Sequence, residues 1–135
     1  MIRKIILLIS LFAVYQYLDI SNLYSQNENI FRVAFWNLEN FYDPFVDSTR
    51  VYNEYTESGA QKWTMQRFYK KRNNLYKVIL SLTEGNPLAI LGLCEIENTF
   101  VTSMLFYETP LRKHNYRIIH YEGDDRRGID VAIIY

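Results

Sequence analysis

Three groups of polar residues in this 135-residue chain follow apolar runs, and their types suit metal and phosphate chemistry. Asn37 lies at the end of a β-branched and aromatic run, and Glu95 directly follows another apolar run. The third group is the polar turn 123–128, which contains Arg127. A carboxylate such as Glu95 can bind a hard divalent cation, Asn37 can donate to a phosphate or orient a carboxylate, and Arg127 can bind a phosphate through two parallel hydrogen bonds.

Each feature also has an ordinary structural explanation. A glutamate that follows an apolar run can be a solvated strand end, and an Arg-Gly turn can be turn chemistry alone. Whether the three groups form one site depends on the strands and helices that position them.

The apolar pattern predicts four strands. Residues 31–38 are rich in β-branched and aromatic side chains, and 88–94 form a near-continuous apolar run of the kind found in strands buried on both faces. A weaker alternation predicts a strand over 116–121, and the polar turn 123–128 separates it from a last strand over 129–135. We expect the last two strands to form an antiparallel hairpin. Because ligands collect at the carboxyl ends of strands in open α/β sheets, the polar strand ends are candidate binding groups.

Helical spacing of apolar residues predicts a helix over 65–82, with Thr64 as its N-cap and the Gly-Asn-Pro segment 85–87 as its end. A long surface loop is expected over 39–63, and a short helix over 99–107. The expected order is therefore β, loop, α, β, short α, β, β, which is an α/β layered fold with a mixed sheet.

Composition excludes several classes of protein. The chain has 15 basic and 15 acidic residues, which argues against a strongly basic module that binds nucleic acid by counterion release alone. A single Cys excludes an internal disulfide and a Cys-rich zinc site. The basic residues of the long helix could contact phosphate, and a solvated helix face explains them as well. These residues are Arg67, Lys70, Lys71 and Arg72.

Residues 1–26 have the order of a secretory signal peptide, with a basic start, an apolar stretch over 5–14 and a polar end. The apolar stretch is shorter than the ~20 residues that a membrane-spanning helix needs. We therefore expect export to the periplasm or the cell exterior, with no stable membrane insertion after the leader is removed. An uncleaved anchor and an ordinary core helix are the alternatives.

The order of these motifs resembles the endonuclease/exonuclease/phosphatase superfamily, the deoxyribonuclease I-like and exonuclease III-like enzymes, and looks closest to a secreted bacterial branch. In that family the first strand ends with an Asn, matched here by Asn37, and the second ends with Gln-Glu, matched by Cys94 and Glu95. Cys94 replaces the usual Gln, which is not the ligand. The resemblance spans 31–135. The matching segments are 37–43, 63–64 and 125–132.

The resemblance implies hydrolysis of a phosphodiester or phosphomonoester with the help of Mg²⁺ or Mn²⁺. Glu95 would bind the metal, Asn37 would orient the phosphate or the catalytic carboxylates, and a water would attack in line. Arg127 and His120 would bind the substrate phosphate, although His120 can equally be a core or strand-edge histidine. Three other acidic residues match no ligand of the family and are interpreted as surface or supporting groups. They are Glu97, Asp124 and Asp125.

The family's active site also contains an Asp-x-Asn motif, a further Asp and a Ser-Asp-His motif, and neither motif occurs in this sequence. Residues 27–135 are therefore expected to form only the N-terminal half of a deoxyribonuclease I-like α/β sandwich with mixed sheets. One sheet face would be left exposed for the missing C-terminal half. We expect this chain alone to be inactive and its parent to be a metal-dependent phosphoesterase, most simply a nuclease. The alternatives are a phosphatase that acts on lipid or sugar phosphates, and a non-catalytic exported binding or structural module.

Overall fold

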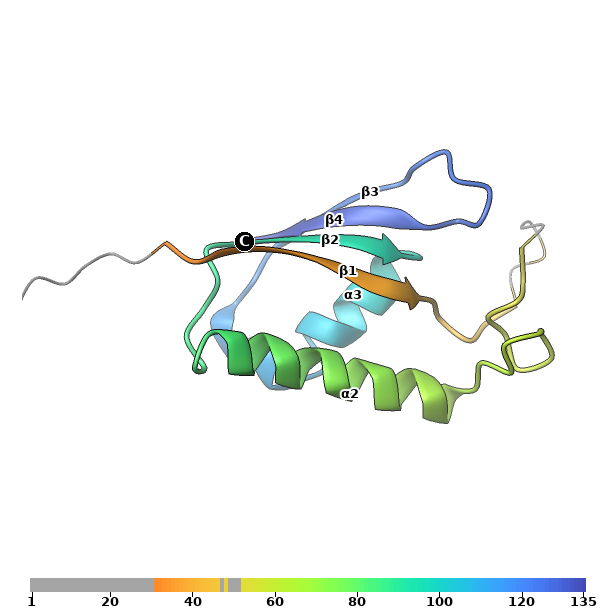
Figure 1. Cartoon of the computed structure of the whole chain (residues 1–135), viewed down its shortest axis with the longest axis horizontal. Coiled ribbons are helices and arrows are strands. Elements are labelled where there is room, and N and C mark those ends of the chain that lie inside the picture. The colour runs from red at the N-terminus through yellow and green to blue at the C-terminus, as the bar shows by residue number, and fades with distance from the viewer. Residues whose placement is uncertain (1–30, 47, 49–51) are drawn as a thin grey trace, which may run out of the picture. The chain divides into compact units, whose positions relative to one another are not determined.

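The computed structural model describes residues 31–46, 48 and 52–135. The predicted signal peptide over 1–26 lies outside these residues. Within them, strands and helices follow one another in the order that the sequence predicts (Figure 1). None of the helices in this part of the chain combines the length and the apolar character that crossing a bilayer requires.

The sheet has four strands in the order β1-β2-β4-β3. Strands β1 (Val33–Phe41) and β2 (Ile90–Ile96) are parallel, whereas β4 (Asp130–Ile134) is antiparallel to both β2 and β3 (Ile118–Tyr121). The predicted mixed sheet and the predicted antiparallel hairpin are both confirmed. The parallel pair brings the carboxyl ends of β1 and β2 to the same edge, where Asn37 and Glu95 lie.

The strand limits differ from the predicted ones by up to three residues, and a hydrogen bond accompanies one of these differences. Strand β2 begins at Ile90 rather than at Leu88, and the amide of Leu88 donates to the Tyr116 hydroxyl (2.8 Å) instead of to a neighbouring strand. Strand β1 continues past Asn37 to Phe41, which pairs with Ile96. The continuation forms one wall of the candidate site described below.

The helices lie on one face of the sheet (Figure 1). Helix α2 (Met65–Leu82) has the predicted bounds, and the Thr64 hydroxyl accepts from the amide of Arg67 as an N-cap. Helix α3 (Thr99–Phe106) is followed by a short 3₁₀ helix, η1 (Pro110–His114), which the sequence analysis did not predict. The buried side chains beneath the sheet form a single core. It includes Leu38, Phe41, Phe68, Leu75, Ile79, Leu91, Leu93, Ile96, Leu105, Phe106 and Ile134.

The opposite face of the sheet carries large apolar side chains that are exposed in the described part of the chain. Phe35 is 75% exposed, and its ring lies over Gly92, the residue opposite it on β2. A Cβ at Gly92 would lie only 2.4 Å from Cδ2 of Phe35. Exposed apolar surface gathered in this way is typical of interaction faces. Other exposed members are Val33, Ile90, Ile119, Tyr121, Val131 and Ile133.

Candidate active site

The candidate site forms where the pairing between β1 and β2 becomes irregular. Asn37 is opposite Cys94, and the next paired residues are Phe41 and Ile96. Residues 38–40 of β1 therefore stand against Glu95 alone on β2. A bulge of this kind bends a strand and redirects its side chains, and bulges are common next to active sites.

Three residues at this edge have a left-handed backbone although none of them is glycine. The φ angles are 54° at Glu39, 63° at Asn40 and 57° at Glu95. Such a conformation costs on the order of 1–3 kcal/mol for each non-glycine residue, and it persists only where the surrounding structure imposes it. Strain on both strands at the same edge favours a functional role for that edge.

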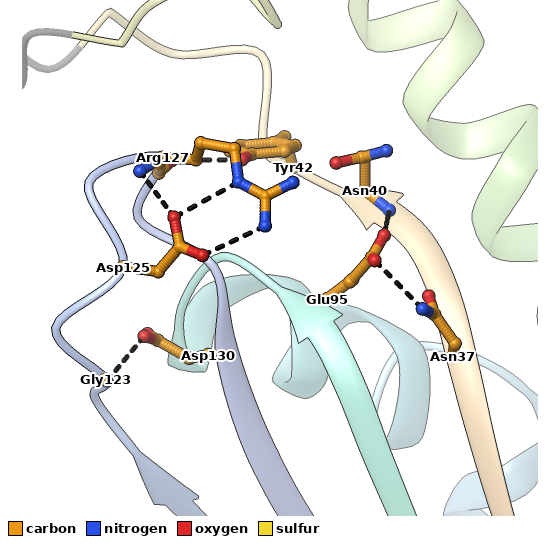
Figure 2. A network of polar contacts seen from close by, with 8 residues as sticks. All are labelled: Asn37, Asn40, Tyr42, Glu95, Gly123, Asp125, Arg127 and Asp130. Carbon is orange, nitrogen blue, oxygen red and sulfur yellow. Dashed lines mark hydrogen bonds and ion pairs between the residues drawn. The ribbon is translucent and has the colours of Figure 1, made fainter.

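The carboxylate of Glu95 is held by two donors from β1 (Figure 2). Its Oε1 accepts from Nδ2 of Asn37 at 2.9 Å, and its Oε2 accepts from the backbone amide of Asn40 at 3.0 Å. The Asn37 amide is itself oriented, because its Oδ1 accepts from the backbone amide of Glu39 at 2.7 Å. The bulge therefore aims both the carboxylate and the group that supports it.

The Glu95 carboxylate fits a divalent cation as a ligand. Each of its oxygens accepts one of these hydrogen bonds and retains a further acceptor position, and the side chain is partly exposed. Mg²⁺ is commonly bound by one or two carboxylates together with waters and phosphate oxygens. In residues 31–46, 48 and 52–135, no cluster of three or more His, Cys, Asp or Glu side chains is placed to hold a metal ion. At this place the described residues therefore offer a cation the Glu95 carboxylate.

Lys71 of α2 is a member of this site that the sequence analysis missed. Its Nζ donates to the backbone carbonyl oxygens of Glu39 and Asn40, the second at 3.3 Å. The sequence pattern assigned Lys71 to the solvated side of the helix, but the residue is half-buried. Burial lowers the pKa of Lys71, and the nearby carboxylates of Glu39 and Glu95 partly oppose this change. No signal in the sequence distinguishes Lys71 from the basic residues around it.

Arg127 lies at the same end of the sheet as Glu95, but it is already paired (Figure 2). Its Nη2 and Nε donate to the two carboxylate oxygens of Asp125 at 2.9 and 3.1 Å, and both side chains are well exposed. These hydrogen bonds hold the pKa of Asp125 below its usual value. The backbone carbonyl of Arg127 accepts from the Tyr42 hydroxyl at 3.0 Å, which fixes the turn. A phosphate at Arg127 would therefore share the guanidinium with Asp125 or displace it.

His120 is paired with Asp130 rather than with the residues around Glu95. Its Nε2 lies 3.1 Å from Oδ2 of Asp130, within ion-pair distance although no aligned hydrogen bond joins the two atoms. Both side chains are nearly buried, and Oδ1 of Asp130 accepts from the amide of Gly123 at 2.9 Å. The structure therefore gives His120 a place in the β3–β4 hairpin, and its role with phosphate stays a prediction. Asp130 was not among the predicted site residues.

A second polar network fixes the loop that follows β1. Glu97 is only 7% exposed, so the surface alternative for this residue is wrong. Its Oε2 accepts from the backbone amide of Asp43 at 2.6 Å, and the Asp43 carboxylate accepts from the Asn98 side chain at 2.8 Å. Asn98 is also the N-cap of α3 through Val101. An Asn directly before a predicted helix was the available signal for this cap.

Aromatic rings pack beside this network. Tyr42 stacks on Tyr55 with ring centroids 4.4 Å apart, and the indole Nε1 of Trp63 donates to the Tyr42 carbonyl at 2.9 Å. Burial raises the pKa of Tyr42. The pKa of Tyr55 is also raised, first by burial and then by the charges of Glu54 and Glu95. These rings tie the loop before α2 to the end of the sheet that carries Glu95.

Comparison with models of protein families gives a match. The model of a family described as "Endonuclease/Exonuclease/phosphatase family" matches residues 32–135. No curated protein and no solved structure matches the chain. The matched range contains every residue of the candidate site.

Proposed function

The chain belongs to the endonuclease/exonuclease/phosphatase family, and we propose that Glu95 is the metal-binding carboxylate of a Mg²⁺- or Mn²⁺-dependent phosphoesterase. Proteins of this family generally hydrolyse phosphoester bonds. The observation that supports the proposal most directly is the Glu95 carboxylate itself. Asn37 and the backbone amide of Asn40 hold it at the bulged edge of the sheet.

The roles of the protein groups follow from these contacts. Glu95 binds the cation, and Asn37 keeps one carboxylate oxygen turned toward β1 while the remaining acceptor positions stay open. A divalent cation bound there would stabilise negative charge on the phosphate and lower the pKa of a coordinated water. Arg127 would bind a phosphate oxygen in exchange for part of its pairing with Asp125.

A phosphodiester is the substrate class that we favour, with nucleic acid first and a lipid or sugar phosphate as the alternative. The formal net charge of zero means that recognition depends on local donors rather than on a broad basic surface. The Asp-x-Asn and Ser-Asp-His motifs of the family do not occur in this sequence. We infer that turnover needs the groups that these motifs supply, and that this chain by itself binds metal without hydrolysing substrate.

Binding of Mn²⁺ to the 135-residue chain tests the proposal. Free Mn²⁺ gives an electron paramagnetic resonance signal that is lost on binding, so the dissociation constant can be measured without turnover. We expect Glu95→Gln to weaken binding by at least about tenfold, because it removes the charged ligand. Glu57→Gln is the matched control, since Glu57 is an exposed glutamate in the loop before α2. Equal Mn²⁺ binding by wild type and Glu95→Gln would remove Glu95 from the metal site.

The same substitution tests catalysis in a protein that also carries the two missing motifs. Glu95→Gln should abolish Mg²⁺-dependent cleavage of a chromogenic phosphodiester. Comparison with a chromogenic phosphomonoester separates the nuclease-like from the phosphatase-like alternative. Absence of cleavage of both substrates, together with specific binding of another ligand, would favour a non-catalytic binding module.

A further inference from the structure

The bulge of β1 is bound from two sides. On one side, the ammonium group of Lys71 donates to the carbonyl oxygens of Glu39 and Asn40. On the other side, the amide of Asn40 donates to Oε2 of Glu95. One short peptide segment therefore connects a helix lysine to the candidate metal ligand.

We propose that Lys71 is a positioning residue for Glu95, acting through the backbone of Glu39 and Asn40. The inference rests on the proposed function, because it assigns to Lys71 the task of holding the carboxylate in its metal-binding orientation. Glu39 and Asn40 both have a left-handed backbone, which non-glycine residues rarely adopt. The Lys71 ammonium group donates to their two carbonyl oxygens and so stabilises this conformation against relaxation to an ordinary strand.

The choice of partners supports a positioning role over a direct one. Lys71 donates to backbone carbonyls, while the Glu95 oxygens accept from Asn37 and from the Asn40 amide. The lysine thus leaves acceptor positions on Glu95 open for a metal ion. The ammonium group also lies 5.8 Å from the centre of the Trp63 ring, which helps to hold the half-buried side chain in place.

The two possible effects of Lys71 on metal binding have opposite signs. As a positive charge near Glu95, Lys71 repels a cation, so simple removal of its charge would strengthen Mn²⁺ binding. As a positioning residue, it supports the ligand geometry, so its removal would weaken binding. Loss of a group that orients a metal ligand typically weakens affinity by about 10–100-fold.

Binding of Mn²⁺ to the full chain, measured by electron paramagnetic resonance, separates these effects. We expect Lys71→Met to weaken binding by about tenfold or more. Lys70→Met is the matched control, because it removes the same charge from the neighbouring, exposed position of α2 and should leave the affinity unchanged. Lys71→Arg should recover part of the affinity, since a guanidinium can donate to two carbonyl oxygens.

A direct structural readout accompanies the affinity. Hydrogen exchange at the Asn40 amide should be faster in Lys71→Met than in Lys70→Met, because the bulge has lost its support. If circular dichroism shows that Lys71→Met is unfolded, Lys71→Gln replaces it, since the amide keeps one neutral donor. Mn²⁺ binding by the folded variant that is as tight as, or tighter than, that of wild type would overturn the proposal.

The outcomes distinguish this proposal from the one on which it rests. If wild type fails to bind Mn²⁺, or if Glu95→Gln binds it equally well, the assignment of Glu95 fails. If wild type binds, Glu95→Gln does not, and the Lys71 variants match wild type, only the positioning role of Lys71 is overturned.

Discussion

The side-chain amide of Asn37 donates to the carboxylate of Glu95 at 2.9 Å, across 58 positions of sequence. Parallel pairing of β1 and β2 makes the contact possible, and the bulge after Asn37 turns the two groups toward each other. The oxygen of the same amide accepts from the backbone of Glu39, so the amide can adopt only one of its two orientations. The pair is thus a donor and an acceptor fixed by the backbone.

Truncation of Asn37 should weaken metal binding while leaving the fold intact. Asn37→Ala removes one of the two donors to Glu95, and we expect Mn²⁺ affinity to fall by roughly tenfold. Because Asn37 is exposed, we expect the free energy of unfolding to change by less than about 1 kcal/mol. Asn74→Ala, the same truncation on the exposed side of α2, is the control for both measurements. Unchanged Mn²⁺ affinity in Asn37→Ala would show that the contact does not orient the ligand.

Gly92 should tolerate a methyl group only when Phe35 is removed. The Cβ of Gly92→Ala would lie 2.4 Å from the Phe35 ring, so the ring must leave its position. We expect a loss of about 1–3 kcal/mol in the free energy of unfolding, measured with urea. In a Phe35→Ala background the same substitution should cost little. Equal costs in the two backgrounds would contradict a clash with Phe35 as the cause.

Asp130 should be important for stability, whereas Asp125 in the neighbouring turn should not. Asp130→Ala leaves the amide of Gly123 and the nearly buried His120 without their partner, and each such loss typically costs about 1–3 kcal/mol. Asp125→Ala breaks only exposed hydrogen bonds, from the side chain and the backbone amide of Arg127, so its melting temperature should stay close to that of wild type. Thermal unfolding followed by circular dichroism compares the two. A similar drop in melting temperature in both variants would argue against a stabilising role of the His120–Asp130 pair.

Alkaline pH should destabilise the protein through its buried and partly buried tyrosines. Burial raises the pKa of Tyr42, Tyr52, Tyr55 and Tyr116 in the folded chain, whereas tyrosines of the unfolded chain ionise near pH 10. A raised folded pKa contributes stability that is fully present below the unfolded pKa. That stability is lost as the pH rises above about 10.

Tyr42→Phe tests this dependence on pH. The variant should lose less stability than wild type between about pH 9 and pH 11, measured by urea unfolding at each pH. It should also be less stable at neutral pH, since it lacks the hydrogen bond to the Arg127 carbonyl. Tyr107→Phe, at an exposed tyrosine, should follow wild type. A Tyr42→Phe curve parallel to that of wild type would exclude Tyr42 as a source of the alkaline loss.

The order of elements could be predicted from the sequence because the signals are local. The apolar run before Glu95, the helical spacing through α2 and the polar turn before β4 each indicate an element without knowledge of its neighbours. The parallel and antiparallel pairings then follow from topology. The short 3₁₀ helix η1 was missed, because five residues carry too little periodicity to be recognised.

The site was only partly predictable for a related reason. Asn37 and Glu95 could be chosen by residue type and by their places after apolar runs. The left-handed backbone at Glu39 and Glu95 could not be foreseen, since this conformation is ordinarily signalled by glycine. The contact between Lys71 and the bulge depends on how α2 docks on the sheet, and that is a property of the whole fold.

At position 95, the residue type that best suits the left-handed backbone differs from the one that metal binding needs. Glycine would adopt this conformation without strain, but it would carry no carboxylate. Conversely, the glutamate keeps the ligand and makes the folded state less stable than it could be. Glycine at position 95 would therefore release backbone strain but leave the Asn37 side chain and the Asn40 amide without their acceptor, and any stability gained in this way would be gained at the expense of metal binding.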